Sequence, residues 1–302
     1  MLPTGLRDTV TGIWGETGTA WLAGLPGLIA DVAADWALQV GPPYPLSINW
    51  VAPAVRADGT LAVVKLGVPD GHLDHEAEAL RAYGGNGAAR LLAADLDRGA
   101  LLIERVDPGE PAATLVPADD AAATAALISV GNRLHRPAPP GCVLPHLRTE
   151  GAAFGRHLSR FPSDDPLPRR LVTHAAGLFA ELCDSATDLL LHGDLHHDNV
   201  LRATREPWLA IDPHGVIGDP GYDCGAMLYN PWPDRLDESL LALVPARIEQ
   251  LADGFRLPVE RVTAWGFVMA VLSEVWGVQD GGPVGGHPLG VATSLYPRVR
   301  RS

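Results

Sequence analysis

Residues 192–223 decide the fold of this chain, and they read HGDLHHDNVLRATREPWLAIDPHGVIGDPGYD. Asp194 precedes Asn199 by five positions, and Asp212 follows after two short apolar runs. A polar segment that contains a proline, 202–207, separates the two runs, so the sequence predicts a β-hairpin. A hairpin brings its two ends together. We therefore expect Asn199 and Asp212 to meet, with Asp194 on the loop just before them.

These residue types suit the transfer of a phosphoryl group from a nucleotide. Such a transfer needs a carboxylate that accepts or orients the proton of the attacking hydroxyl, and Asp194 is the candidate catalytic residue. It also needs hard oxygen ligands for Mg²⁺, which Asn199 and Asp212 can supply. The sequence thus predicts a kinase that uses ATP and Mg²⁺.

The order of these residues resembles the catalytic loop and metal-binding aspartate of the protein-kinase-like fold. His-Gly-Asp at 192–194 is similar to the small-molecule branch, the aminoglycoside phosphotransferases, and the text from Leu191 to Asp223 is similar to the streptomycin 6-phosphotransferase and hydroxyurea kinase group. The resemblance implies an α+β, bilobal fold. A small N-terminal lobe with an antiparallel sheet and helices would occupy 1–106, and a larger, mainly helical catalytic and substrate-binding lobe would occupy 107–302.

The resemblance also indicates how the N-terminal lobe binds ATP. Lys65, on a strand predicted at 61–66, matches the lysine that contacts the nucleotide phosphates in this fold. A lysine in a buried strand needs a counter-charge. The helix predicted at 75–83 offers Glu76 and Glu78, and the family's spacing favours Glu76.

Two further segments of this lobe concern the nucleotide. The strand predicted at 100–106 would end in the hinge, where backbone groups read adenine whatever the side chains: Glu104, Arg105 and Val106. The loop 41–47 lies where this fold covers the phosphates, but it holds three prolines and lacks the glycine pattern. Prolines stiffen a loop and remove N–H donors. This departure leaves open how the triphosphate is covered, with Ser47 and Asn49 as weak candidate donors.

Apolar periodicity predicts the remaining elements. A helix over 18–40, with Pro26 near its start, is expected to pack on the sheet. Strands are predicted at 47–55 and 88–93. Further helices are predicted at 119–136, 168–184, 236–253 and 259–278, and a flexible tail at 281–286.

Composition limits the class of protein. A net charge of −13 argues against a nucleic-acid partner, because phosphates attract lysine and arginine. Three dispersed cysteines without a C-x-x-C pair suggest neither disulfides nor zinc, so a reducing cytoplasm fits. No signal peptide is recognised at the N-terminus. The apolar stretch 21–40 carries two aspartates and a proline, which argues against a membrane span.

The substrate follows from the resemblance and from charge. The family phosphorylates small molecules, and an aminoglycoside of the streptomycin type is the first expectation. An acidic chain attracts cations, so we expect a small, hydroxylated, cationic partner that contacts residues of the catalytic loop and of the last predicted helix: His196, Asp198, Glu274 and Asp280. A sugar, a hydroxyurea-like compound or a peptide antibiotic is the alternative substrate.

Two alternatives come from other classes. Together with His197 and Asp194, His192 and His196 could form a zinc site of a metal-dependent hydrolase, because these two histidines are four residues apart, one turn on a helix. Gly193 and the hairpin argue for a loop instead, and zinc would leave Lys65 unexplained. An inactive kinase-like binding protein is the second alternative, and the joint presence of the lysine, the two aspartates and the asparagine argues against it.

Overall fold

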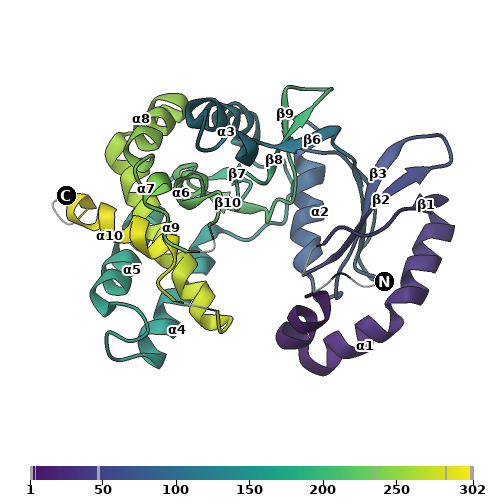
Figure 1. Cartoon of the computed structure of the whole chain (residues 1–302), viewed down its shortest axis with the longest axis horizontal. Helices are drawn as coiled ribbons and strands as arrows, with labels where there is room; N and C mark the ends of the chain where they lie inside the picture. The colour runs from purple at the N-terminus through teal and green to yellow at the C-terminus, as the bar shows by residue number, and fades with distance from the viewer. Residues whose placement is uncertain (1–2, 4, 46–47, 234, 283, 300–302) are drawn as a thin grey trace. The chain divides into compact units, whose positions relative to one another are not determined.

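The structure is a computed structural model of the chain, and it describes every residue except 1–2, 4, 46–47, 234, 283 and 300–302. The chain divides into two units, Met1–Asp107 and Pro108–Ser302, called here the N-terminal unit and the C-terminal unit. The sequence places this boundary after residue 106. Each unit has its own sheet and helices (Figure 1), in keeping with an α+β, kinase-like architecture.

The N-terminal unit is built on a five-stranded antiparallel sheet in the order β1-β2-β3-β5-β4. Its strands are β1 (Leu38–Val40), β2 (Trp50–Arg56), β3 (Leu61–Leu66), β4 (Leu91–Asp95) and β5 (Ala100–Glu104). A turn at Gly59, whose φ of 84° suits glycine, joins β2 to β3. The strand predicted at 61–66 has the expected bounds, whereas β2 and β4 begin three residues later than predicted.

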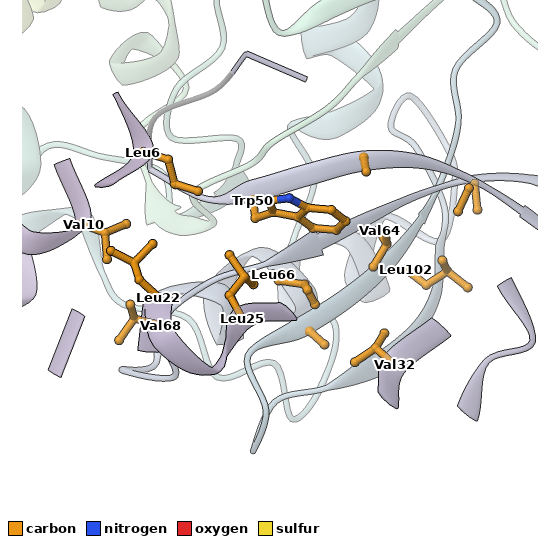
Figure 2. Packing of buried hydrophobic residues seen from close by; sticks show 14 residues of the cluster. Leu6, Val10, Leu22, Leu25, Val32, Trp50, Val64, Leu66, Val68 and Leu102 are labelled. Atoms are coloured by element: carbon orange, nitrogen blue, oxygen red, sulfur yellow. The ribbon is translucent and has the colours of Figure 1, made fainter. Parts of the chain in front are cut away.

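The helix α1 (Leu6–Asp35) covers one face of this sheet (Figures 1 and 2). Apolar side chains from the helix and from alternate strand positions form one buried cluster, which includes Leu22, Leu25, Val32, Trp50, Val64, Leu66 and Leu102. The prediction of a helix on the sheet is confirmed, but its bounds were wrong. The helix begins at Leu6, is interrupted at Gly15 and holds Pro26 in its interior rather than near its start. It ends before Ala37, whose φ is positive.

The opposite face of the sheet carries α2 (His72–Tyr83), which contacts β4 and β5. Side chains alternate between the faces of a sheet. Val64 and Leu66 point toward α1, and Lys65 between them therefore points toward α2. Gly84 ends this helix in the left-handed conformation, with its N–H on the carbonyl of Leu80 at 3.0 Å.

The C-terminal unit is mainly helical. Its helices are α3 (Asp120–Leu134), α4 (Ala152–Arg160), α5 (Arg169–Asp184), α6 (Gly221–Tyr229), α7 (Glu238–Leu241), α8 (Val244–Phe255), α9 (Val259–Gln279) and α10 (His287–Val299), with short 3₁₀ turns at Ala112–Leu115 and Leu147–Gly151. The single helix predicted at 236–253 is in fact α7 and α8, because Pro245 starts a new helix. The predicted tail at 281–286 leads into α10, which periodicity missed.

Helix α9 forms the centre of this unit. By length and composition it could cross a membrane, yet 72% of its most apolar window is buried inside the structure. Helices α4, α5, α6, α8 and α10 all contact it. Its apolar character therefore follows from its place in the core, as for the central helix of a soluble protein.

Two small sheets position the predicted catalytic loop. One pairs β7 (Leu189–Leu191) with β10 (Val216–Gly218), and the other orders β6 (Pro108–Pro111), β8 (Val200–Ala203) and β9 (Trp208–Ala210). Strands β8 and β9 pair antiparallel, with Val200 opposite Ala210. The predicted hairpin is thus confirmed, and the loop 192–199 connects β7 to its first strand.

Candidate active site

The loop 192–199 is held by a buried carboxylate on α6. Asp223 accepts hydrogen bonds from the backbone N–H of His192 at 3.1 Å and of Gly193 at 2.8 Å. The ring of His135, at the end of α3, lies 2.9 Å from the same carboxylate. Asp223 thus holds the start of the loop by hydrogen bonds to the loop's backbone N–H groups. These bonds do not involve the side chains of the loop.

His192 braces the loop rather than facing a ligand. Its Nε2 donates to the carbonyl of Ile211 at 2.9 Å, and its Nδ1 accepts from the N–H of Asp194 at 3.2 Å. Burial lowers the pKa of this histidine, which agrees with a neutral ring that donates on one side and accepts on the other. Both ring nitrogens are thereby committed, and the zinc site considered for His192 and His196 lacks its first ligand.

Asn199 holds Asp194 in place. Its Nδ2 donates to the Asp194 backbone carbonyl at 3.0 Å and lies 3.4 Å from the carboxylate Oδ2. The Asn199 side chain is buried, and 32% of the Asp194 side chain is exposed. Because the NH₂ group of the amide faces Asp194, its oxygen lies on the other branch and can serve as a ligand.

Charge around Asp194 keeps it ionised. Burial by itself would raise the pKa of the carboxyl, but the hydrogen bond and charge of His196, with a smaller contribution from His214, hold it below the ordinary value. Burial likewise opposes protonation of His196, and Asp194 and Asp198 outweigh it, raising the pKa of His196 to about 9. Nε2 of His196 lies 3.4 Å from Asp194 Oδ2. The loop therefore places the His196 ring beside the Asp194 carboxylate.

Asp212 reaches the same end of the hairpin as Asn199. The N–H of Ile211, the residue before Asp212, donates to the carbonyl of Asn199 at 2.9 Å. The backbone at Ile211 therefore lies beside the backbone at Asn199. Asp212 has a φ of 59°, in the left-handed region that is uncommon for residues other than glycine. The convergence expected from the sequence is present in the backbone.

The donors at this point fit Mg²⁺ better than zinc. A carboxylate and a carboxamide are hard oxygen ligands, and Mg²⁺ usually takes one or two such groups with the remaining positions filled by phosphate oxygens and water. Within the described part of the chain, no cluster of three or more histidine, cysteine, aspartate or glutamate residues is arranged to hold a metal. A soft, closed metal site is therefore not formed by these residues.

In the N-terminal unit, Lys65 forms a buried ion pair with Glu76. Nζ lies 2.6 Å from Oε2, and the two side chains are 8% and 5% exposed. Glu78 instead faces Arg81 at 3.7 Å on the half-buried side of α2. The choice of Glu76 over Glu78 as the partner of the lysine is confirmed by this contact.

The predicted hinge has fewer available N–H groups than expected. Glu104 donates its N–H to the carbonyl of Arg90 at 2.8 Å, and Arg105 donates to Leu61 at 3.3 Å. Among these three hinge residues, only the N–H of Val106 has no partner within the described part of the chain. The sheet, whose pairing the sequence does not specify, uses the other two.

The four candidate substrate residues separate into two groups. His196 and Asp198 lie on the loop, with Nδ1 of His196 3.7 Å from Oδ2 of Asp198. The Asp198 side chain is 51% exposed. Asp280 is exposed at the end of α9. Glu274 is buried and accepts from the N–H groups of Gly285 and Leu289 at 3.1 and 3.0 Å. It ties the start of α10 to α9, so we withdraw it as a substrate contact.

Sequence reasoning missed His214. It lies 3.9 Å from Asp194 Oδ2 and is exposed, and a side chain at Gly193 would meet its Cβ at 3.1 Å. The only signal was its position two residues after Asp212. Asp219, on the segment after Asp212, accepts from Trp265 Nε1 at 2.9 Å and from the N–H of Gly221 at 2.7 Å.

Fold and site together define a small-molecule kinase of the protein-kinase-like class. The structure resembles that of the choline kinase from Streptococcus pneumoniae, with a TM-score of 0.63 at 14% identity over 92% of this chain and 99% of that one. The same choline kinase has also been solved in complex with AMP, with a TM-score of 0.58. At this level of identity the likeness shows the fold.

Sequence comparison gives the family. Residues 45–281 match the family described as aminoglycoside/hydroxyurea antibiotic resistance kinase, and the chain belongs to it. It is 37% identical to a streptomycin 6-kinase of Streptomyces griseus, over 93% of this chain and 92% of that protein. It is 38% identical to a hydroxyurea phosphotransferase of Kitasatospora aureofaciens, over 93% and 81%. The expected family and enzyme class are confirmed.

Proposed function

We propose that this enzyme transfers the γ-phosphoryl group of ATP to a hydroxyl of an aminoglycoside of the streptomycin type. The observation that carries the proposal is the convergence of Asp194, Asn199 and Asp212 around one hairpin, in a member of this kinase family. A carboxylate and two hard oxygen donors, carried by one loop and its hairpin, are the residue types that serve phosphoryl transfer.

Asp194 would orient the acceptor hydroxyl of the substrate and accept its proton. The acceptor oxygen forms a bond to the γ-phosphorus, the bond from that phosphorus to the bridging oxygen of ADP breaks, and the hydroxyl proton passes to the Asp194 carboxylate. The lowered pKa of this group makes it a weak base. That suits a loose transition state in which orientation of the hydroxyl matters more than early removal of its proton.

Asn199 and Asp212 would hold Mg²⁺, which when bound neutralises phosphate charge during transfer. Asn199 has a second task, because its NH₂ group fixes Asp194 while its oxygen is turned away. Loss of this residue should therefore affect both the metal and the acceptor position. A cytoplasmic location is also proposed, since the three cysteines of the chain are free thiols.

Lys65 would contact the ATP phosphates. Its ammonium group is buried, and Glu76 fixes its direction. Nucleotide use is supported by the AMP complex of the choline kinase that shares the fold. The backbone of Val106 would contribute to adenine recognition, together with carbonyl groups of Glu104 and Arg105.

A cationic aminoglycoside is favoured over other acceptors by two observations. The streptomycin 6-kinase of S. griseus is similar over nearly the whole chain, and Asp198 presents an exposed carboxylate two residues before β8, the strand that follows the loop. Exposed carboxylates can pair with guanidinium groups. The hydroxyurea phosphotransferase, which is similar to the same extent, makes a hydroxyurea-like compound the second candidate.

The experiment is a parallel acceptor assay. Purified enzyme with Mg²⁺ and ATP is incubated separately with streptomycin, hydroxyurea and a neutral sugar, and products are examined by mass spectrometry. Streptomycin should gain the mass of one phosphate while ADP forms in equal amount. Phosphorylation of the neutral sugar but not of streptomycin would overturn the cationic acceptor and leave the kinase chemistry in place.

A further inference from the structure

The loop between β1 and β2 is closed at its base by the sheet. The N–H groups of Gly41 and Tyr44 donate to the carbonyls of Pro53 and Val51, each at 2.8 Å, and continue the pairing beyond the strands. Asn49 is the last loop residue before β2. Of the two donors suggested by the sequence, Ser47 lies outside the described residues, and Asn49 is half-buried.

Asn49 contacts the first residue of α2. Its Oδ1 lies 3.0 Å from Nε2 of His72. Glu76 follows His72 by four residues, so both side chains lie on one face of the helix. Through Glu76 the helix holds Lys65, and through His72 it holds the end of the loop 41–49. No motif in the sequence singles out His72.

His72 is itself fixed from two sides. Asp70 Oδ1 contacts both the ring Nδ1 and, at 3.0 Å, the backbone N–H of His72. Trp14 of α1 donates its Nε1 to Asp70 Oδ2 at 2.6 Å, and its ring packs on the His72 ring with centroids 5.7 Å apart. These contacts point Nε2 at Asn49. The Asn49 amide can present its oxygen or its NH₂ group, so it can bind the ring with or without a proton on Nε2.

Gly67 is a second observation in favour of the His72–Asn49 contact, because it leaves the space that the two side chains occupy. A Cβ there would lie 2.5 Å from Asn49 Oδ1 and 2.8 Å from His72 Nε2. Gly67 is buried, and its φ lies outside the left-handed region. Space, and not backbone conformation, therefore requires glycine at this position, because any side chain would force the histidine and the asparagine apart.

We propose that His72 is a positioning residue for the nucleotide. It tethers the loop 41–49, through Asn49, to the helix that orients Lys65, so that the phosphate-covering loop and the phosphate-binding lysine are set by the same element. This inference rests on the proposed use of ATP. It also gives the proline-rich loop, which lacks a glycine pattern, a side-chain contact at Asn49 in addition to the backbone hydrogen bonds of Gly41 and Tyr44.

The test measures the Kd of Mg²⁺–AMP-PNP by calorimetry for the full chain, without any acceptor. His72→Ala should weaken binding about five- to tenfold, the loss expected for one hydrogen bond that orders a binding loop. Asn49→Ala should weaken it similarly, and the double variant no further. Gly67→Ala should reproduce the effect with both partners present. His72→Gln, whose amide can reach Asn49, should restore binding to within about twofold, and KM for the acceptor should stay unchanged.

His75→Ala is the matched control, because His75 is exposed one turn away from the tether on the same helix. Thermal unfolding of every variant separates lost binding from lost folding. The tether is refuted if His72→Ala binds AMP-PNP as the His75→Ala control does, or if the effects of His72→Ala and Asn49→Ala add. Failure of the unmodified enzyme to bind AMP-PNP would overturn the proposed function itself, and the tether with it.

Discussion

The two units hold their functional groups by different means. In the C-terminal unit, the loop 192–199, which carries Asp194, is held by backbone N–H groups that converge on Asp223. In the N-terminal unit, Lys65 and the loop 41–49 are held by side chains of one helix, Glu76 and His72. Substitution of Asp194 leaves the hydrogen bonds to Asp223 in place, whereas substitution of Glu76 or His72 removes the contact itself. The comparison therefore predicts where substitutions abolish chemistry and where they weaken binding or folding.

The largest loss of activity is expected for substitution of Asp194, because this residue is proposed to act on the substrate whereas Asp223 anchors the loop. Asp194→Asn removes the proton acceptor and keeps the shape, so kcat should fall by about 10²–10⁴. The Kd of ATP and the melting temperature should stay near those of the unmodified enzyme, because Asp223 still holds the loop. Steady-state kinetics, calorimetry and thermal unfolding measure the three quantities. Asp198→Asn, which removes the proposed contact with the acceptor, should raise KM for the acceptor and change kcat far less, and an equal loss of kcat in both variants would contradict the assignment.

The next effect concerns the ion pair of the N-terminal unit. Glu76→Ala leaves the ammonium of Lys65 buried without its partner, and breaking a buried pair in this way costs about 3–5 kcal/mol. Glu78→Ala should change the free energy of unfolding by about 0.5 kcal/mol or less, since its contact with Arg81 is half-exposed. Urea unfolding measures both. Equal losses would mean that Glu76 is not the residue that stabilises the lysine.

Substitution of Asp223, which anchors the loop of the C-terminal unit, should cost less stability than loss of Glu76. Asp223→Asn keeps one oxygen for the backbone N–H groups of His192 and Gly193 and loses the other, at a cost of about 1–3 kcal/mol. Activity should fall together with the melting temperature, unlike in Asp194→Asn. Normal stability with lost activity would show that Asp223 acts on the chemistry and not on the loop.

The smallest effect tests the packing of the C-terminal unit. Burial raises the pKa of the Cys183 thiol to about 11, so its reactive thiolate forms only well above neutral pH. At pH 8 iodoacetamide should label the half-buried Cys142 and leave Cys183 and Cys224 unlabelled. Peptide mass spectrometry reads the sites. Rapid labelling of Cys183 in the folded enzyme would contradict the tight packing of this unit.

The difference between the units also explains what the sequence could predict. The hairpin and its convergence of Asn199 and Asp212 were predictable, because two short apolar runs and a turn lie within 13 residues. Lys65 and Glu76 were predictable because a motif spacing on a strand and on a helix selects them. Local signals thus predicted the hairpin of the C-terminal unit and the Lys65–Glu76 ion pair of the N-terminal unit.

Contacts between distant segments were not predictable. The tether of His72 joins residues 23 positions apart, and its support from Trp14 spans 56. The role of Glu274 depends on α10, which periodicity did not reveal, so its charge was assigned to the substrate instead of to two backbone N–H groups. The start of α1 was also missed, because Gly12, Gly15 and Gly18 weaken its helical pattern.

One measurement tests the central claim most directly: transfer of label from [γ-³²P]ATP to streptomycin, with Mg²⁺ and with EDTA. With Mg²⁺ the enzyme should give labelled streptomycin, one for each ADP formed, and EDTA should abolish the product because Asn199 and Asp212 then have no ion to present to the phosphates. ADP formation without labelled streptomycin would contradict the proposed acceptor. Full transfer in EDTA would contradict the Mg²⁺-dependent kinase itself.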